Sequence, residues 1–308
     1  MSNSLYIVRN YRPSDFGDYV KLNIEAEKLD PSGLHRSPEA VSENLNRPNY
    51  SPEQDLFVVE TDEKVVGFIN LTPELKTERV ILDCLVHPEH RRKGLATKLL
   101  GYALRRAKEL KTKVTRVNIR QDNIVAKLVL PNLGFRFVRQ FSELSLSLSD
   151  LPDAALNIYS YRHLQPGEED KLTQIQNRCF ADNWEFNPNT TEEIVYYTNL
   201  SHRSPEDVVL ICEGDKPIGY CWTGISCEVE TVNSERKGRV FMLGVNPDYR
   251  GRGIGKIALL AGVSYLKSKG VQVVELTVDN ENEVACALYR SVGFKLWTTT
   301  LWYEKVID

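Results

Sequence analysis

The stretch "NPDYRGRGIG" at 246–255 decides the fold, and a second version of it, "HPEHRRKGLA", occurs at 87–96. Each copy follows an apolar run, 239–245 or 79–86, and precedes a segment with helical spacing. Glycines in such a turn let successive backbone N–H groups point into one concavity at the positive end of the helix dipole. The pattern therefore predicts a phosphate-binding turn that is present twice.

The duplication extends beyond the turn. The segment "DLFVVETDEKVVGF" at 55–68 matches "DVVLICEGDKPIGY" at 207–220, and both read as β-hairpins. "NIVAKLVLPNLGF" at 123–135 matches "NEVACALYRSVGF" at 282–294. The second half is about seven residues longer, and we place the extra residues in the loop "EVETVNSERKG". The chain therefore reads as two copies of one domain.

Both halves have the same order of predicted elements. A strand and a helix come first, followed by a hairpin, a strand that ends at the glycine turn, a helix, a strand, a short helix and a final strand. A hairpin followed by a βαβ crossover predicts an α/β fold with a mixed sheet flanked by helices. The stretch "SDLPDAALN" at 149–157 interrupts the pattern and sets the predicted domains at 1–152 and 153–308.

Composition restricts the function. With 42% hydrophobic residues, 26% charged residues and a net charge of −3, the chain resembles a globular protein rather than a nucleic-acid binder. Basic residues cluster in both turns, at 91–93 and 250–256, and local clusters in a nearly neutral chain indicate a small anionic ligand. The chain shows no signal peptide and no apolar run of membrane-spanning length, so we expect a cytoplasmic protein without a membrane partner. No metal is expected, because six cysteines lack metal-ligand spacing and are typical of free thiols in a reducing compartment: Cys84, Cys179, Cys212, Cys221, Cys227 and Cys286.

Two other phosphate motifs do not fit the turn. A P-loop requires Ser or Thr after its lysine, whereas Lys256 is followed by Ile257. The spacing Gly253-x-Gly255-x-x-Ala258 imitates a dinucleotide-binding fingerprint. Its ribose-binding carboxylate belongs at the C-terminal end of the next strand, but Glu275 falls inside that strand.

The turn at 250–255, followed by Asn282-x-x-Ala285 and by Tyr289-x-x-x-Gly293, resembles the GCN5-related N-acetyltransferase (GNAT) superfamily in tandem form. The resemblance covers essentially the whole chain. It implies a splayed mixed sheet that holds acetyl-CoA, or another acyl-CoA, and transfers the acetyl group to a primary amine. It places the cofactor in the second half against Leu243, Gly244, Val245, Arg250, Gly251, Arg252, Gly253, Ile254, Gly255, Lys256, Asn282 and Ala285. The matching positions of the first half are Leu85, Val86, Arg91, Arg92, Lys93, Gly94, Leu95, Ala96 and Asn123.

Acetyl transfer to an amine needs a deprotonated nucleophile and a proton for the departing thiolate. Tyr289 is the candidate acid, since a phenol keeps its proton at neutral pH. Asn282 lies seven residues earlier, on the same helix face, and is also suited to cap the helix. The small side chain of Ala285 leaves room for the cofactor arm.

The base is less well defined by sequence. Tandem members of the family that this chain most resembles carry a glutamate early on the strand before the turn, where this chain has Arg239, which cannot accept a proton. Glu228 and Glu230 alternate on the preceding segment and are the candidate bases, with a solvated strand face as the alternative. A substrate amine that arrives deprotonated would need no base at all.

The first half has lost part of this set. Leu130 stands where the second half has Tyr289, and Pro131 follows inside the expected helix, where it should distort the last turn. Asp83 is the only carboxylate of the strand before the turn, and we interpret it as structural. We therefore expect catalysis in the second half and a catalytically degenerate first half. A non-catalytic CoA-binding or regulatory module is the alternative.

The acceptor is not named by any residue. The connection "FADNWEFNPNTTEEIVYY" after the first helix of the second half should set it, through Trp184, Glu185 and Asn187. A small amine and a peptide N-terminus both remain open as acceptors. A monomer is possible, because one chain already contains two such domains. No nucleic acid is expected as a partner.

Overall fold

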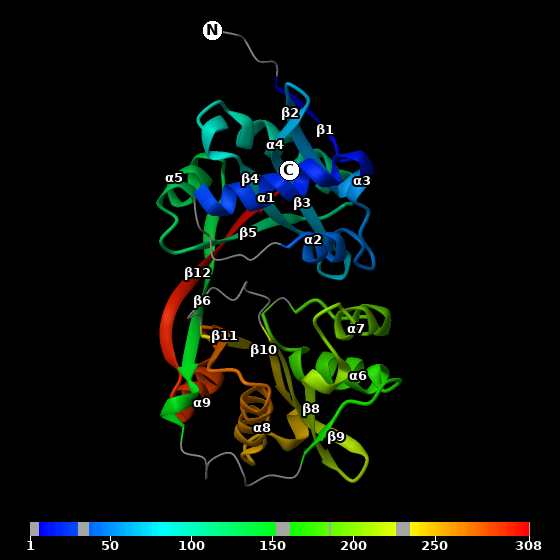
Figure 1. The fold of residues 1–308 in the computed structure, drawn as a ribbon, viewed down its shortest axis with the longest axis vertical. Helices are drawn as coiled ribbons and strands as arrows, with labels where there is room; N and C mark the ends of the chain where they lie inside the picture. The colour runs from blue at the N-terminus through cyan, green and yellow to red at the C-terminus, as the bar shows by residue number, and fades with distance from the viewer. Residues whose placement is uncertain (1–5, 30–36, 152–160, 185, 226–234, 308) are drawn as a thin grey trace. The chain divides into compact units, whose positions relative to one another are not determined.

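A computed structural model describes residues 6–29, 37–151, 161–184, 186–225 and 235–307 (Figure 1). The chain forms two compact units, Met1–Arg139 with Leu301–Asp308, and Gln140–Thr300. Each unit is described by itself below.

Unit 1 contains the first glycine turn between a strand and a long helix. Its hydrogen-bonded strands follow the order β1-β2-β3-β4-β5-β12. The neighbours are antiparallel from β1 to β4, and β4 and β5 are parallel. Its elements are β1 (Ile7–Asn10), α1 (Phe16–Leu29), α2 (Pro38–Leu45), α3 (Pro52–Asp55), β2 (Leu56–Thr61), β3 (Lys64–Glu74), β4 (Arg79–Val86), α4 (Leu95–Glu109), β5 (Val114–Arg120) and α5 (Ile124–Asn132).

Unit 2 repeats this layout around the second turn. Its strands follow the order β6-β11-β10-β9-β8-β7, with β10 and β11 parallel. Its elements are β7 (Arg162–His163), α6 (Glu169–Phe180), α7 (Thr191–Thr198), β8 (Val208–Glu213), β9 (Lys216–Ile225), β10 (Lys237–Val245), α8 (Ile254–Ser268), β11 (Val273–Asp279) and α9 (Glu283–Val292). The mixed sheet and the repeated element order confirm the predicted fold class.

The last strand of each repeat adds to the unit that contains the other repeat (Figure 1). From β6 (Arg136–Ser147) of the first repeat, residues 141–147 pair antiparallel with β11 in unit 2. The end of β12 (Lys295–Val306) lies beside β5 in unit 1, where Ile307 N–H donates to the Lys113 carbonyl. The predicted boundary at residue 152 separates the two repeats of the sequence, whereas the compact units exchange these strands. Residue spacing gives repeats, not strand partners, and therefore could not reveal the exchange.

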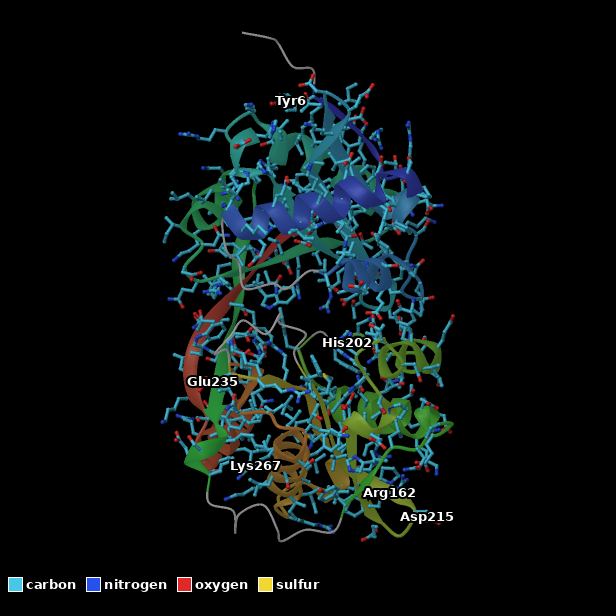
Figure 2. All side chains as sticks on the ribbon, viewed as in Figure 1. Tyr6, Arg162, His202, Asp215, Glu235 and Lys267 are labelled. Atoms are coloured by element: carbon cyan, nitrogen blue, oxygen red, sulfur yellow. The ribbon has the colours of Figure 1, made fainter. Side chains whose placement is uncertain are left out.

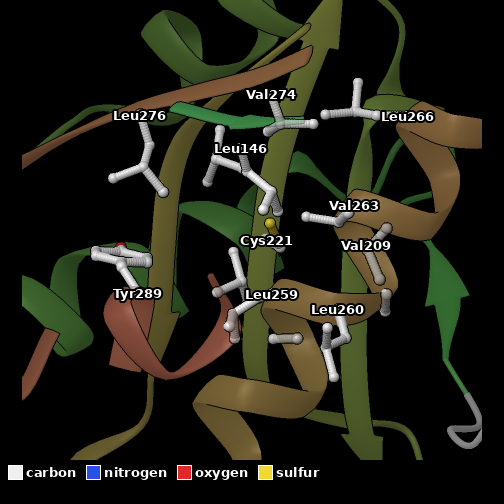
Figure 3. Close-up of a cluster of buried hydrophobic side chains, with 14 of the residues drawn as sticks. Leu146, Val209, Cys221, Leu259, Leu260, Val263, Leu266, Val274, Leu276 and Tyr289 are labelled. Atoms are coloured by element: carbon white, nitrogen blue, oxygen red, sulfur yellow. The ribbon is translucent and has the colours of Figure 1, made fainter. Parts of the chain in front are cut away.

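The two faces of the unit 2 sheet have separate cores. The helices α8 and α9 pack on a face that includes Cys221, Val240 and Leu276, together with Leu144 and Leu146 of the exchanged β6 (Figure 3). The helices α6 and α7 pack on the other face, against Tyr220 and Trp222. We call these the α8/α9 face and the α6/α7 face.

The described cysteines are free thiols, as predicted, and burial raises the pKa of Cys179 to about 12.

The parallel strands of unit 2 pair over a short length only. The register of β10 with β11 runs from Lys237↔Val273 to Val240↔Leu276. Beyond that pair β10 continues on β9 to Val245, with a bulge between Val240 and Met242, and β11 continues on β6 to Asp279. The splay predicted by resemblance is therefore present, and we call Val240/Leu276 the splay point.

A buried ion pair fixes the exchanged end of β12 in unit 1. Glu304 accepts hydrogen bonds from Arg116 on β5 and, at 3.0 Å, from Arg136, and the side chains of Arg116 and Glu304 are only 4% and 9% exposed. Burial alone would raise the pKa of Glu304, but the two arginines outweigh it and hold the pKa below its ordinary value. Glu304 therefore stabilises a unit built mainly from the other repeat.

We predict that Glu304→Gln lowers the free energy of unfolding of unit 1 by about 3 kcal/mol at pH 7, because it leaves Arg116 buried beside a neutral partner. The stabilisation is complete above the ordinary glutamate pKa of about 4.5 and is lost as the pH falls through the lowered value, so the deficit should shrink in acid. Hydrogen exchange of β4 and β5 amides measures it. Glu109→Gln, which removes an exposed partner of Arg106, is the control and should change stability by less than about 0.5 kcal/mol. A loss confined to unit 2 amides would contradict the assignment.

Candidate active site

The second glycine turn has a backbone that only glycine adopts readily. A short 3₁₀ turn, Pro247–Tyr249, leads from β10 into Gly251 with φ +75° and Gly253 with φ +79°, and Gly253 caps α8. No atom lies within 4 Å of the position that a Cβ would take at either glycine. The N–H groups of Ile254 and Gly255 at the start of α8 have no partner within the helix, whereas Lys256 N–H donates to the Gly253 carbonyl at 3.1 Å. The turn therefore has the shape and polarity of a phosphate cradle.

The arginines of the cradle differ in their surroundings. Arg250 donates to the carbonyl oxygens of Val245, at 3.3 Å, and Cys179, at 2.7 Å, so it fixes the turn to the ends of β10 and α6. Arg252 donates to the Asp248 carbonyl at 3.3 Å and lies over the Tyr249 ring. Sequence alone suggested only that both arginines add positive charge, but Arg250 also braces the turn.

The cradle lies at the end of β10, close to where β10 has left β11. Leu243, Gly244 and Val245 hydrogen-bond to β9 on one side, and no pairing with β11 extends to them. Gly255 places its α-carbon beside the Leu288 and Val245 side chains, with 3.4 and 3.6 Å to an ideal Cβ. The β10 edge beyond the splay point and the cradle thus form one continuous strip of backbone.

Asn282 and Tyr289 occupy the two ends of α9. The Asn282 side chain accepts from Ala285 N–H at 3.1 Å, so it caps the helix. Tyr289 is 7% exposed and belongs to the apolar cluster of the α8/α9 face, near Leu276 of the splay point (Figure 3). Burial raises the pKa of Tyr289 well above its ordinary value, with smaller contributions from Cys221 and Cys286. The phenol is therefore protonated at neutral pH.

The cradle of unit 1 keeps the backbone shape but has different neighbours. Gly94 has φ +74° and caps α4, while Arg92 adopts φ +61° where the second copy has Gly251. The Lys93 ammonium donates to the Tyr6 hydroxyl at 2.7 Å, and Lys98 donates to the Tyr6 carbonyl at 2.9 Å. Tyr6, labelled in Figure 2, directly precedes β1. Both of these lysines are thus hydrogen-bonded to Tyr6 of the same unit.

The helix after the first cradle lacks the phenol. Leu130 is buried where α9 has Tyr289. Pro131 lies inside α5, which nevertheless continues to Asn132. When the two repeats are aligned, α5 ends one residue earlier than α9. The expected distortion is confined to that last turn, where Leu133 N–H faces three carbonyls. Asn123 caps α5 through Ala126 N–H at 3.0 Å, as Asn282 caps α9. Asp83 is exposed on β4.

The ligand atoms of His87, Glu89 and His90 lie within 4.8 Å of one another beside this turn. The Nδ1 atom of each histidine already has a partner within the chain. His87 Nδ1 accepts from Glu89 N–H at 3.3 Å, and His90 Nδ1 lies 3.1 Å from the Tyr6 hydroxyl. We interpret this group as bracing of the first turn.

Charged side chains cross the splay point on the α6/α7 face of unit 2. Arg239 of β10 donates to Glu143 of β6 at 3.0 Å and to the hydroxyl of Thr277 on β11. The Glu143 side chain is 15% exposed and that of Arg239 is 33% exposed. Sequence analysis did not identify Glu143. The sequence signal that could have identified it is the alternation of polar and apolar residues in "FSELSLSLS" at 141–149. Glu143 is the single charged residue of this stretch.

The loop between α6 and α7 reaches the same face. The Trp184 ring lies 6.1 Å from that of Phe141, two residues before Glu143 on β6. Several buried polar atoms of this half have no hydrogen-bond partner within the described part of the chain: Gln176 Oε1, Asn187 Oδ1, Tyr220 Oη and Trp222 Nε1. Glu228, Glu230 and Glu185, which sequence analysis also proposed, lie outside the described residues.

A splayed mixed sheet with a phosphate cradle at the end of one parted strand defines a protein that binds an acyl-CoA. The model of the acetyltransferase (GNAT) family matches residues 23–135 and again 170–294. The chain therefore belongs to the GNAT acetyltransferase family, with one copy in each repeat. This confirms the predicted enzyme class, an acetyl-CoA-dependent N-acetyltransferase.

Known relatives and structures agree with this assignment. A mycothiol acetyltransferase of Stackebrandtia nassauensis is 30% identical over 82% of this chain and 83% of its own length. One of Actinosynnema mirum is 28% identical over 94% and 96%. A GCN5-related N-acetyltransferase from Sphaerobacter thermophilus shares the fold with a TM-score of 0.73 at 23% identity, covering 98% and 96% of the two chains. A tandem GNAT protein from the clavulanic acid biosynthesis pathway does so with a TM-score of 0.70 at 15% identity, covering 99% of each chain. Within the described ranges, no helix is long and apolar enough to cross a membrane.

We predict that Gly253→Val weakens acetyl-CoA binding by at least about tenfold, because a branched side chain is strained at φ +79° and forces the cradle to change shape. Calorimetric titration measures the affinity. Gly270→Val is the matched control: Gly270 has φ +81° at the opposite end of α8 and should lose stability without losing affinity. Equal affinities for Gly253→Val and the wild type would remove the cradle from the binding site.

Proposed function

We propose that unit 2 transfers the acetyl group of acetyl-CoA to a primary amine, with Tyr289 as the proton donor to the departing thiolate. The single observation that carries the proposal is the combination of an open cradle, a parted β10 edge and a buried phenol in one unit. Acetyl-CoA supplies an activated acyl group and a thiolate leaving group.

The residues present fit that cofactor. The N–H groups at 251–255 are suited to the pyrophosphate, with the Arg252 and Lys256 side chains adding charge at the exposed rim. The β10 edge at Leu243 and Val245 offers the pantetheine arm strand-like hydrogen bonds. Asn282 fixes the start of α9 and so orients Tyr289, and Ala285 leaves space beside the arm.

Tyr289 is suited to donate rather than to accept a proton. Its raised pKa keeps the phenol protonated, and its place in an apolar cluster excludes water from the proton that it transfers. The thiolate formed on acyl transfer is the only group that requires this proton.

Unit 1 has the cradle without the phenol. We infer that it serves as scaffold or holds CoA without turnover, because Leu130 offers no proton. The relatives are named mycothiol acetyltransferases, and a small-molecule amine is therefore the first class of acceptor to test. Reduced free cysteines favour the cytoplasm as the site of action.

The decisive experiment is a screen of amines with detection of released thiol. Glucosamine represents amino sugars, and glycylglycine represents peptide N-termini. Release of CoA with any amine supports the proposal. If the protein binds acetyl-CoA tightly but releases no CoA with any amine of the screen, a non-catalytic CoA-binding module is favoured.

We predict that Tyr289→Phe lowers turnover by about 10²- to 10⁴-fold and leaves the affinity for acetyl-CoA unchanged, because only the proton donor is removed. Thiol release and calorimetry measure the two quantities. Tyr303→Phe, which alters a phenol of similar burial in unit 1, is the control and should retain turnover. Unchanged turnover in Tyr289→Phe would exclude Tyr289 from the chemistry.

A further inference from the structure

The splay point divides the α6/α7 face of unit 2 into a closed part and an open part. Arg239 lies opposite Gly224 on β9, two residues from Trp222, so Arg239 and Trp222 point to the same face. On β11, Thr277 is the first residue beyond the last pair with β10, and its hydroxyl contacts Arg239. The charged side chains therefore lie where the sheet opens.

The carboxylates of Glu275 and Glu143 both face this side of the sheet, and they differ in position. Glu275 pairs with Lys237 at 3.2 Å, in the part where β10 and β11 are still joined. Glu143 stands opposite Thr277 in the register of β6 with β11, and thus beside the open part. Glu143 is fixed by Arg239 from the side and remains partly exposed.

We propose that Glu143, carried into unit 2 by the exchanged strand β6, binds the ammonium form of the acceptor and takes its proton. The inference rests on the proposed acetyl transfer in unit 2. A carboxylate is needed because a primary amine is mostly protonated near neutral pH and cannot attack in that form. Arg239 cannot fill this role, since a guanidinium keeps its proton.

Arg239 has a positioning role in this arrangement. Its guanidinium occupies one side of the Glu143 carboxylate and anchors it to Thr277, which leaves the other lone pairs for a substrate N–H. Trp184 packs on Phe141, the preceding residue on the same strand face, and so limits the acceptor site on that side.

The reaction balances with residues that are already in place. One N–H bond of the ammonium breaks and its proton passes to a Glu143 carboxylate oxygen. The freed nitrogen lone pair forms the bond to the acetyl carbon, the carbon–sulfur bond breaks, and the sulfur takes the proton of Tyr289. The second nitrogen proton leaves as the amide forms, and proton exchange with solvent restores both side chains.

The test compares Glu143→Gln with Glu275→Gln, using glucosamine or glycylglycine, whichever the wild type acetylates faster. We expect Glu143→Gln to lower kcat/KM by about 10²-fold or more at pH 7. The deficit should shrink towards pH 9, because the fraction of free amine rises about tenfold per pH unit below the amine pKa. Glu275→Gln, which also breaks an ion pair with a basic β10 residue, should stay within about threefold of the wild type.

Calorimetry with acetyl-CoA confirms that each variant is folded and binds its donor. Glu143→Asp keeps the charge on a shorter arm and should fall between the wild type and Glu143→Gln. A Glu143→Gln deficit that is equal at every pH, or no larger than that of Glu275→Gln, would overturn the assignment. A wild-type enzyme that acetylates no amine would instead overturn the proposed function itself.

Discussion

The separation of β10 from β11 is the constraint on which the rest of unit 2 depends. Parallel strands satisfy their backbone groups by pairing, yet this pair ends after Val240 and Leu276 although both strands continue. Each strand then keeps one partner only, β9 or β6. Unpaired strand edges inside a sheet need another partner, and a linear amide-bearing ligand supplies one. The bulge beside Val240 turns β10 away, and the cradle at its end holds the charged part of such a ligand.

The strand exchange provides the second partner that the separation requires. Without β6, the part of β11 beyond Leu276 would have no neighbour on either side. Leu144 and Leu146 of β6 also complete the core of the α8/α9 face. The polar residues of the same strand point the other way, and among them is Glu143, beside the open part of the sheet. One strand therefore closes the core and places a carboxylate beside the splay point, so this side of unit 2 is built from residues of both repeats.

Much of this arrangement could be predicted from sequence. Local signals located the hairpins, the helix that follows the second glycine turn, and the capping role of Asn282, because each depends on residues close in the chain. The family resemblance of the turn at 250–255 predicted that the sheet is splayed. The exchange of β6 and β12 could not be predicted, because strand partners depend on long-range packing that residue spacing does not encode. For the same reason sequence reasoning considered Glu228 and Glu230, near β10 in the chain, and did not consider Glu143, about a hundred residues away.

The two cradles show which features the cofactor turn needs and which features the chemistry needs. The positive φ of Arg92 and Gly94 shows that unit 1 keeps the backbone conformation even where a glycine has been replaced. That conformation is costly for an arginine, since a side chain at positive φ is strained. The Tyr6 hydroxyl contacts His90 and Lys93 of the first turn from outside it, which offsets the strain. The phenol has no such support and has become Leu130, a residue that preserves the buried volume of the core. Packing therefore maintains the shape of the first turn in unit 1, where Leu130 offers no proton, whereas unit 2 has both the turn and the phenol of Tyr289.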